Sequence, residues 1–199
     1  MVRLTRRQRR PRTRGQALVE FALVIPIFLI VALGLVEFAF VFNAVLATNF
    51  ASRTAALLAA EAGDGVGSDC VILQSVEREM GAPVDKNRIL QVDIYWADAN
   101  GAQIANNVTT YTRGGTKTCN YPDGTSITVP YTNTIDNYPE ASRCNVLAGC
   151  GGGHNGVDTI GVRITYSHQW KTPLNNFLSN GSGGYVFSRS NSMRMEPVL

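Results

Sequence analysis

Two carboxylates border an apolar run near the start of the sequence. Residues 21–36 contain no charged side chain, and Glu20 and Glu37 lie directly before and after them. An ionised carboxylate in hydrocarbon costs about 3 kcal/mol on insertion scales and needs a partner. The chemistry that these positions suggest is ion pairing at a membrane segment. For Glu37, which lies near the far interface, a position without a role is the alternative.

A second feature is the boundary at Gly15. Residues 1–15 contain seven arginines and no acid, and glycine offers a peptidase a site without a clashing side chain. We predict cleavage after Gly15 by a membrane peptidase, at a processing site formed by Gly15, Gln16, Glu20 and Phe21. The new α-amine on Gln16 would lie about one helical turn from Glu20 and could pair with it. Alternatively, Glu20 lies at the headgroup boundary without a role.

The four cysteines are candidates for disulfide bonds. Four cysteines allow three pairings, and the short loop CNVLAGC leads us to prefer Cys144–Cys150 together with Cys70–Cys119. A zinc site would combine His154 with Cys144 and Cys150, but the sequence lacks a C-x-x-C motif. We therefore expect no metal and leave the pairing open.

The sequence shows no catalytic set. Nucleophile-elbow, H-E-x-x-H and phosphate-loop patterns are absent from it. His168 is interpreted as a strand-face residue, and Glu77 and Glu79 as a solvated helix face. We expect no enzyme and no cofactor.

The apolar run has the length of a membrane span. Residues 21–42, with Glu37 as the one interruption, have about the ~20 residues that a bilayer requires, and we place the transmembrane half of the helix at about residues 17–42. The arginines on its N-terminal side predict a single-pass protein of the cell membrane, with the N-terminus in the cytoplasm and the C-terminal domain outside. A cleaved secretory signal is disfavoured by the two glutamates and the lack of an A-x-A site. A twin-arginine signal is disfavoured by Pro11 and the further arginines.

The charge distribution supports this division. The net charge of +3 combines the basic leader with a remainder that holds 11 basic and 15 acidic groups. A basic tail can bind nucleic acid, but its position beside an apolar run favours a membrane flank, and we expect no nucleic-acid partner. The body would lie where disulfides form. We predict three parts: a basic cytoplasmic leader (1–15), a long helix (16–62) and an extracytoplasmic α+β domain (63–199).

The predicted helix continues beyond the membrane. Residues 16–62 contain one proline, Pro26, and we expect a kink there. A helix of this kind is roughly 65–70 Å long. Its second half is amphipathic, with large apolar residues near one stripe and alanines every four residues on another (Leu46, Phe50 and Leu57; Ala47, Ala51, Ala55 and Ala59). The alanines either allow a second helix to approach closely or cover a sheet.

The body is predicted to be α+β, a long helix packed on a small, mainly antiparallel sheet. Residues 68–82 are typical of a short helix. Alternating apolar residues predict strands within 88–101 and 159–173, and 109–134 contain the turns of a hairpin. Residues 184–198 are expected to form a last strand, and 133–158 a loop insertion.

Aromatic residues of the body suggest a further partner. Trp96 and Trp170 either pack in the core or, with Tyr111, Tyr121 and Tyr131, form a stacking surface for a glycan or host ligand. A membrane-tethered adhesin or enzyme is therefore one function that the sequence leaves open.

Residues 14–60 resemble the TadE-like family, which are minor pilins or pseudopilins of tight-adherence (Flp) pili and are similar to type IV pilins. The matching parts are Arg14-Gly15, Glu20-Phe21, Pro26, Glu37 and the continuation ASRTAALLAA. The terminal MRMEP, residues 193–197, also resembles the end of such proteins.

The resemblance implies a pilin-like fold and a structural role in adhesion or secretion. A prepilin peptidase would cleave after Gly15. Glu20, Glu37 and Pro26 would then serve assembly, and the helix would contact other pilins, the pilus assembly platform and lipid. The length of the chain favours a minor pilin or pseudopilin, resident in the membrane or incorporated into a surface pilus.

Overall fold

The N-terminal helix α1 dominates the molecule. It spans Thr13–Ala62, 50 residues, in the computed structural model, which describes residues 13–173 and 184–197. It therefore begins before Gln16, the start that we predicted, and ends where we predicted. The leader up to residue 12 lies outside the described residues.

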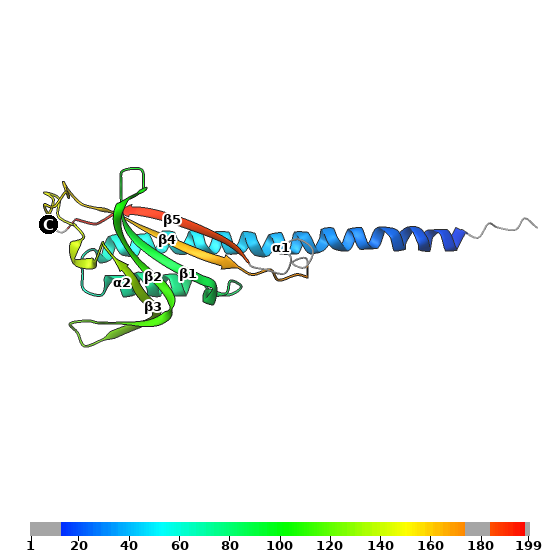
Figure 1. The fold of residues 1–199 in the computed structure, drawn as a ribbon, viewed down its shortest axis with the longest axis horizontal. Helices are drawn as coiled ribbons and strands as arrows, with labels where there is room; N and C mark the ends of the chain where they lie inside the picture. Colours follow the sequence, from blue (N-terminus) through cyan, green and yellow to red (C-terminus); the bar gives the residue numbers. More distant parts are fainter. Residues whose placement is uncertain (1–12, 174–183, 198–199) are drawn as a thin grey trace, which may run out of the picture.

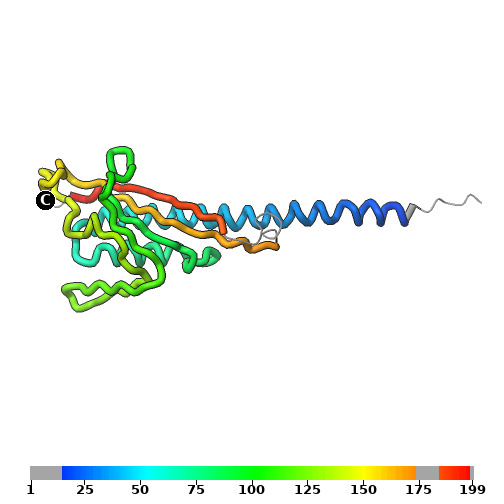
Figure 2. Tube along the Cα trace, in the orientation of Figure 1, coloured from blue at the N-terminus to red at the C-terminus, as the bar shows by residue number. Residues whose placement is uncertain are grey.

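Helix α1 continues through Pro26 without interruption. Figures 1 and 2 show α1 as one long rod without a sharp bend. The kink that we expected is therefore not evident. The N-terminal half of α1 extends away from the domain, and only its C-terminal half packs against other elements.

The domain is built on a five-stranded antiparallel sheet in the order β3-β2-β1-β4-β5. The predicted α+β class is confirmed. Hairpins join β1 to β2 and β2 to β3, as the turn residues indicate. The next connection is not a hairpin: a long loop leads from the edge strand β3 back to β4, which lies beside β1. The strands are β1 (Ile89–Ala97), β2 (Gln103–Asn120), β3 (Ser126–Asp136), β4 (Thr159–His168) and β5 (Tyr185–Arg194).

The helices cover one face of this sheet. Helix α1 packs against β4 and β5, and α2 (Ser68–Glu79) packs against α1, β2 and β3. The alternating apolar residues of the central strands form the core, as their period of two predicts. Val92 and Ile94 of β1 are fully buried beside Ile164 and Val162 of β4, their register partners.

The alanine stripe of α1 faces this core. Ala51, Ala55 and Ala59 are fully buried against the domain. Small side chains let other elements approach the helix axis closely, which large side chains would prevent. Since α1 packs against both α2 and the strands β4 and β5, the stripe faces a core that the second helix and the sheet share.

Two disulfides fasten the domain, with the pairing that the sequence favoured. Cys70–Cys119 links α2 to β2, and Cys144–Cys150 closes a short loop after β3. The first bond joins segments 49 residues apart, and the second joins segments only 6 residues apart. The Cys70–Cys119 bond therefore closes the longer loop and restricts the unfolded chain more than the Cys144–Cys150 bond does.

The loop between β3 and β4 begins later than we predicted, because β3 continues to Asp136. Asp158 organises this loop. Its carboxylate accepts hydrogen bonds from the hydroxyl of Tyr138 at 2.8 Å and the backbone N–H of Cys144 at 2.9 Å, and it contacts Nδ1 of His154 at 2.6 Å. The ring of His154 in turn stacks on Trp96 with 4.2 Å between centroids. These contacts give His154 and Trp96 structural roles.

Candidate assembly helix and its carboxylates

The predicted processing site lies at the first turns of α1. Gly15 is helical, and a Cβ placed on it would meet no atom within 4 Å. The amide Nε2 of Gln16 donates to Oε1 of Glu20 at 3.0 Å, and both side chains are exposed, as is that of Phe21. The spacing thus places residues 16 and 20 on one face of the helix, one turn apart.

The N-terminal half of α1 presents an apolar surface. Among the described residues, α1 is the one helix that is long and apolar enough to cross a membrane, and none of its most apolar window is buried within the molecule. Its large exposed side chains are Leu18, Val19, Phe21, Leu23, Val24, Ile27, Phe28, Leu29, Ile30, Val31, Leu35 and Val36. Such a surface is stable only in lipid or against partner helices.

Glu37 is the most buried carboxylate of this helix. Only 2 % of the residue is exposed. Its carboxylate accepts hydrogen bonds from Nε2 of His168 at 3.0 Å and from the backbone N–H groups of Lys171 at 3.0 Å and Thr172 at 2.8 Å. The end of β4 and the chain after it therefore hold this side chain in a site with three donors.

His168 is a residue of strand β4, as we predicted, and it also binds Glu37. Glu37 is not left without a contact near an interface, since the domain covers its carboxylate. A buried carboxylate requires donors because desolvation would otherwise disfavour its charged form. The two residues are 131 positions apart, and no local pattern in the sequence relates them. An acid followed only by apolar residues was the one signal that a distant partner was required.

The Glu37 site marks the level at which α1 enters the domain. Glu37 is the first buried residue of the helix, and Ala44 and Thr48 follow on the same side. The opposite side of α1 remains exposed over the same length. Its large apolar residues form an outer stripe of Phe42, Leu46, Phe50 and Leu57, which continues the apolar surface of the N-terminal half.

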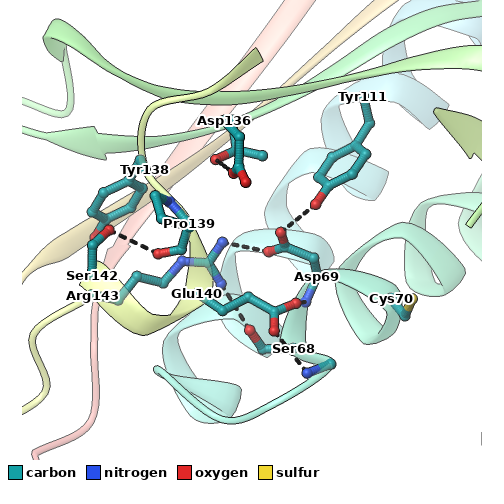
Figure 3. Close-up of polar contacts among 12 residues, drawn as sticks. Ser68, Asp69, Cys70, Tyr111, Asp136, Tyr138, Pro139, Glu140, Ser142 and Arg143 are labelled. Atoms are coloured by element: carbon teal, nitrogen blue, oxygen red, sulfur yellow. Dashed lines mark hydrogen bonds and ion pairs between the residues drawn. The ribbon is translucent and has the colours of Figure 1, made fainter. Parts of the chain in front are cut away.

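A buried polar cluster lies at the other end of the domain (Figure 3). The carboxylate of Glu140 accepts hydrogen bonds from the backbone N–H groups of Gly67 at 2.8 Å and Asp69 at 3.0 Å. It thereby caps the N-terminus of α2, which has no side-chain cap of its own. The guanidinium of Arg143 donates to Ser68 at 2.8 Å and pairs with Asp69.

This cluster borders an open cavity of about 340 Å³ that Asp69, Tyr111, Lys117 and Glu140 help to line. The carboxylates are already engaged, since the hydroxyl of Tyr111 also donates to Asp69. Burial and the neighbouring Asp69 carboxylate raise the pKa of Tyr111 well above its usual value, so it stays a donor. The contacts therefore fasten the long loop to α2. Within the described part of the chain, no group of three acidic, histidine or cysteine side chains is placed to hold a metal ion.

The expectation for Glu77 was wrong. Its carboxylate lies under the sheet edge, pairs with Arg113 and accepts a hydrogen bond from the hydroxyl of Tyr131 at 2.7 Å. Burial opposes the charge of Arg113, but the Glu77 carboxylate outweighs it and raises the pKa of Arg113. Glu79 instead pairs with the exposed Arg78. The pattern of apolar and polar residues in α2 predicted that both acids lie on a polar face, but it did not show that β2 and β3 cover part of this face.

The aromatic residues considered for glycan stacking do not form one surface. Tyr111 and Tyr131 are buried, and Tyr121 donates its hydroxyl to the carbonyl of Gly67 at 3.0 Å. Trp96 and Trp170 lie at opposite ends of the sheet, beside the start and the end of β4. The proposed five-residue platform was therefore wrong.

The geometry defines an α+β domain fixed to a helix that is compatible with a single-pass membrane anchor. Residues 15–57 match the family model for TadE-like proteins. The resemblance is thus confirmed for this segment, and it supports a protein associated with a Tad pilus. The comparisons with curated proteins and with solved structures give no match.

Proposed function

We propose that this chain is a structural subunit, a TadE-like minor pilin or pseudopilin of a Tad (Flp) pilus. The observation that carries the proposal is the family match over residues 15–57, which covers the exposed apolar half of α1 together with Glu20 and Glu37. The family is structural, and the buried polar clusters of the domain have structural partners. A non-enzymatic role without a cofactor is therefore the simplest assignment.

In this proposal α1 crosses the cell membrane once. The leader with its arginines lies in the cytoplasm, and the domain lies outside, where its two disulfides are stable. The outer stripe of Phe42, Leu46, Phe50 and Leu57 then contacts helices of other pilins or of the assembly platform. Packing against such partners would remove the apolar side chains from water.

Maturation is the first step to test. A prepilin peptidase cleaves after Gly15 and frees the amine of Gln16, which lies one turn from Glu20. The N-terminal sequence of the protein purified from membranes of a host with an active peptidase should begin at Gln16. Gly15→Leu is the matched control, because its side chain meets no atom in the folded helix and should block only the cut. A mature chain that still begins at Met1 would refute the cleavage.

Assembly is the second step. Glu20→Ala should insert into the membrane normally but reduce the pili that are sheared from cells, because the new amine loses its carboxylate partner. Glu61→Ala, at an exposed position near the end of the same helix, is the control and should leave pilus output unchanged. Normal pilus output from Glu20→Ala would count against a role for this carboxylate.

A further inference from the structure

The end of the domain nearest the N-terminal half of α1 combines two aromatic residues with a lysine and a valine. Trp170 and Lys171 follow β4, while Tyr185 and Val186 begin β5. The register pairs His168 with Tyr185 and Ser167 with Val186, so these segments lie at one end of the sheet. Figure 1 shows this end of β4 and β5 pointing along α1 toward its N-terminal half.

The side chains at this end are amphipathic. Tyr185 is 55 % exposed and Val186 is 53 % exposed, Lys171 is exposed, and Trp170 is half-buried. Tryptophan and tyrosine rings are enriched at the headgroup level of membranes, where one part of the ring is apolar and the other is wet. Lysine extends its ammonium toward phosphates while its stem covers apolar surface. We call these four residues the collar.

The Glu37 site fixes the position of the collar along α1. The backbone N–H of Lys171 binds the Glu37 carboxylate directly, and His168 binds it from the end of β4. From Gln16 to Glu37 the helix rises about 32 Å at its standard rise per residue. The hydrocarbon layer of a bilayer is about 30 Å thick. With Gln16 at the cytoplasmic face, Glu37 and the collar reach the opposite headgroup layer.

We propose that the collar is a lipid-binding surface that lies in the headgroup layer of the outer leaflet. The inference rests on the proposed membrane insertion of α1, and it adds that the folded domain itself touches the bilayer. The exposed apolar surface of α1 reaches Val36, next to the Glu37 that Lys171 of the collar binds, so lipid is the occupant that suits both surfaces. The Glu37 site then fixes the position of the domain along the membrane normal, with the collar in contact with the headgroups.

The two tryptophans provide a direct test. The full chain is reconstituted into vesicles of phosphatidylcholine and phosphatidylglycerol that contain a lipid with a nitroxide on its headgroup. Trp96→Phe reports Trp170 at the collar, and Trp170→Phe reports Trp96 at the opposite end of the sheet. We expect the nitroxide to quench the emission of Trp170 several-fold more than that of Trp96. Flotation of the vesicles measures membrane insertion independently.

The outcomes separate the two proposals. Protein that floats with the vesicles but shows equal quenching of both tryptophans overturns the collar and leaves membrane insertion intact. Protein that does not float overturns both. Since Trp96 stacks on His154, Trp96→Phe can disturb folding, and a second pair keeps Trp96. Trp170→Phe/Tyr185→Trp should be quenched several-fold more than Trp170→Phe alone, and an equal result would again overturn the collar.

Discussion

The contact between Glu37 and His168 can be measured with a double-mutant cycle. Glu37→Ala, His168→Ala and the double variant separate the direct interaction from the effect of each truncation. The Nε2–Oε1 distance is 3.0 Å, and both side chains are almost fully buried. Hydrogen bonds to charged groups contribute about 1.5–3 kcal/mol. We therefore expect a coupling energy of about 2 kcal/mol.

The assay is urea unfolding of the full chain in detergent micelles, followed by near-ultraviolet circular dichroism. The control is a second cycle on Arg78 and Glu79, whose side chains are 72 % and 34 % exposed. Exposed pairs contribute about 0.2–1 kcal/mol. The Glu37 cycle should therefore give a clearly larger coupling than the control cycle.

The result that would refute the reasoning is additivity. Distant, independent sites add to within about 0.5 kcal/mol, so a smaller coupling would mean that Glu37 and His168 do not interact in the folded protein. Single-variant losses alone would not suffice, because each truncation also leaves a buried polar group behind. Glu37→Ala should cost more than His168→Ala, since it also removes the acceptor of Lys171 and Thr172.

Two further predictions concern the domain. Replacing Cys70 and Cys119 by alanine should lower the free energy of unfolding by about 4 kcal/mol, and replacing Cys144 and Cys150 should lower it by about 2 kcal/mol. The difference is expected because the entropy that a disulfide removes from the unfolded chain grows with the number of residues in the closed loop. Urea unfolding of the two variants measures both losses, and equal losses would contradict the prediction. Glu140→Ala should lower the free energy of unfolding by about 1 kcal/mol, since α2 loses its cap; hydrogen exchange should be faster at the first turn of α2, and unchanged exchange there would argue against the cap.

Local patterns in the sequence were sufficient for the helix and the sheet. Apolar and alanine-rich residues with Pro26 as the one proline predicted α1 through Ala62, and the period of two in Ile160, Val162 and Ile164 predicted β4. Both signals depend only on neighbouring residues, which explains their success. The family resemblance likewise rests on one continuous segment.

Contacts between distant segments could not be predicted in the same way. Glu77 sits on a polar face of α2, and nothing near it in the sequence shows that Arg113 and Tyr131 will cover it. Glu37 and His168 likewise meet only because the sheet places the end of β4 beside α1. Long-range polar pairs carry no periodic signal, so a single sequence gives only one hint: a charged residue in apolar surroundings needs a partner.

In the amphipathic half of α1, the large apolar side chains point in the opposite direction from what such a pattern usually indicates. A surface helix usually turns its large apolar residues toward the core, but here the alanines face the core and the larger residues, such as Phe50 and Leu57, face outward. Helix α2 and the sheet supply the bulky side chains of the core, so α1 needs only small ones at that contact. The outward residues then contribute little to the stability of this domain. In the pilus subunit that we propose, their apolar character serves contact with a partner outside the chain.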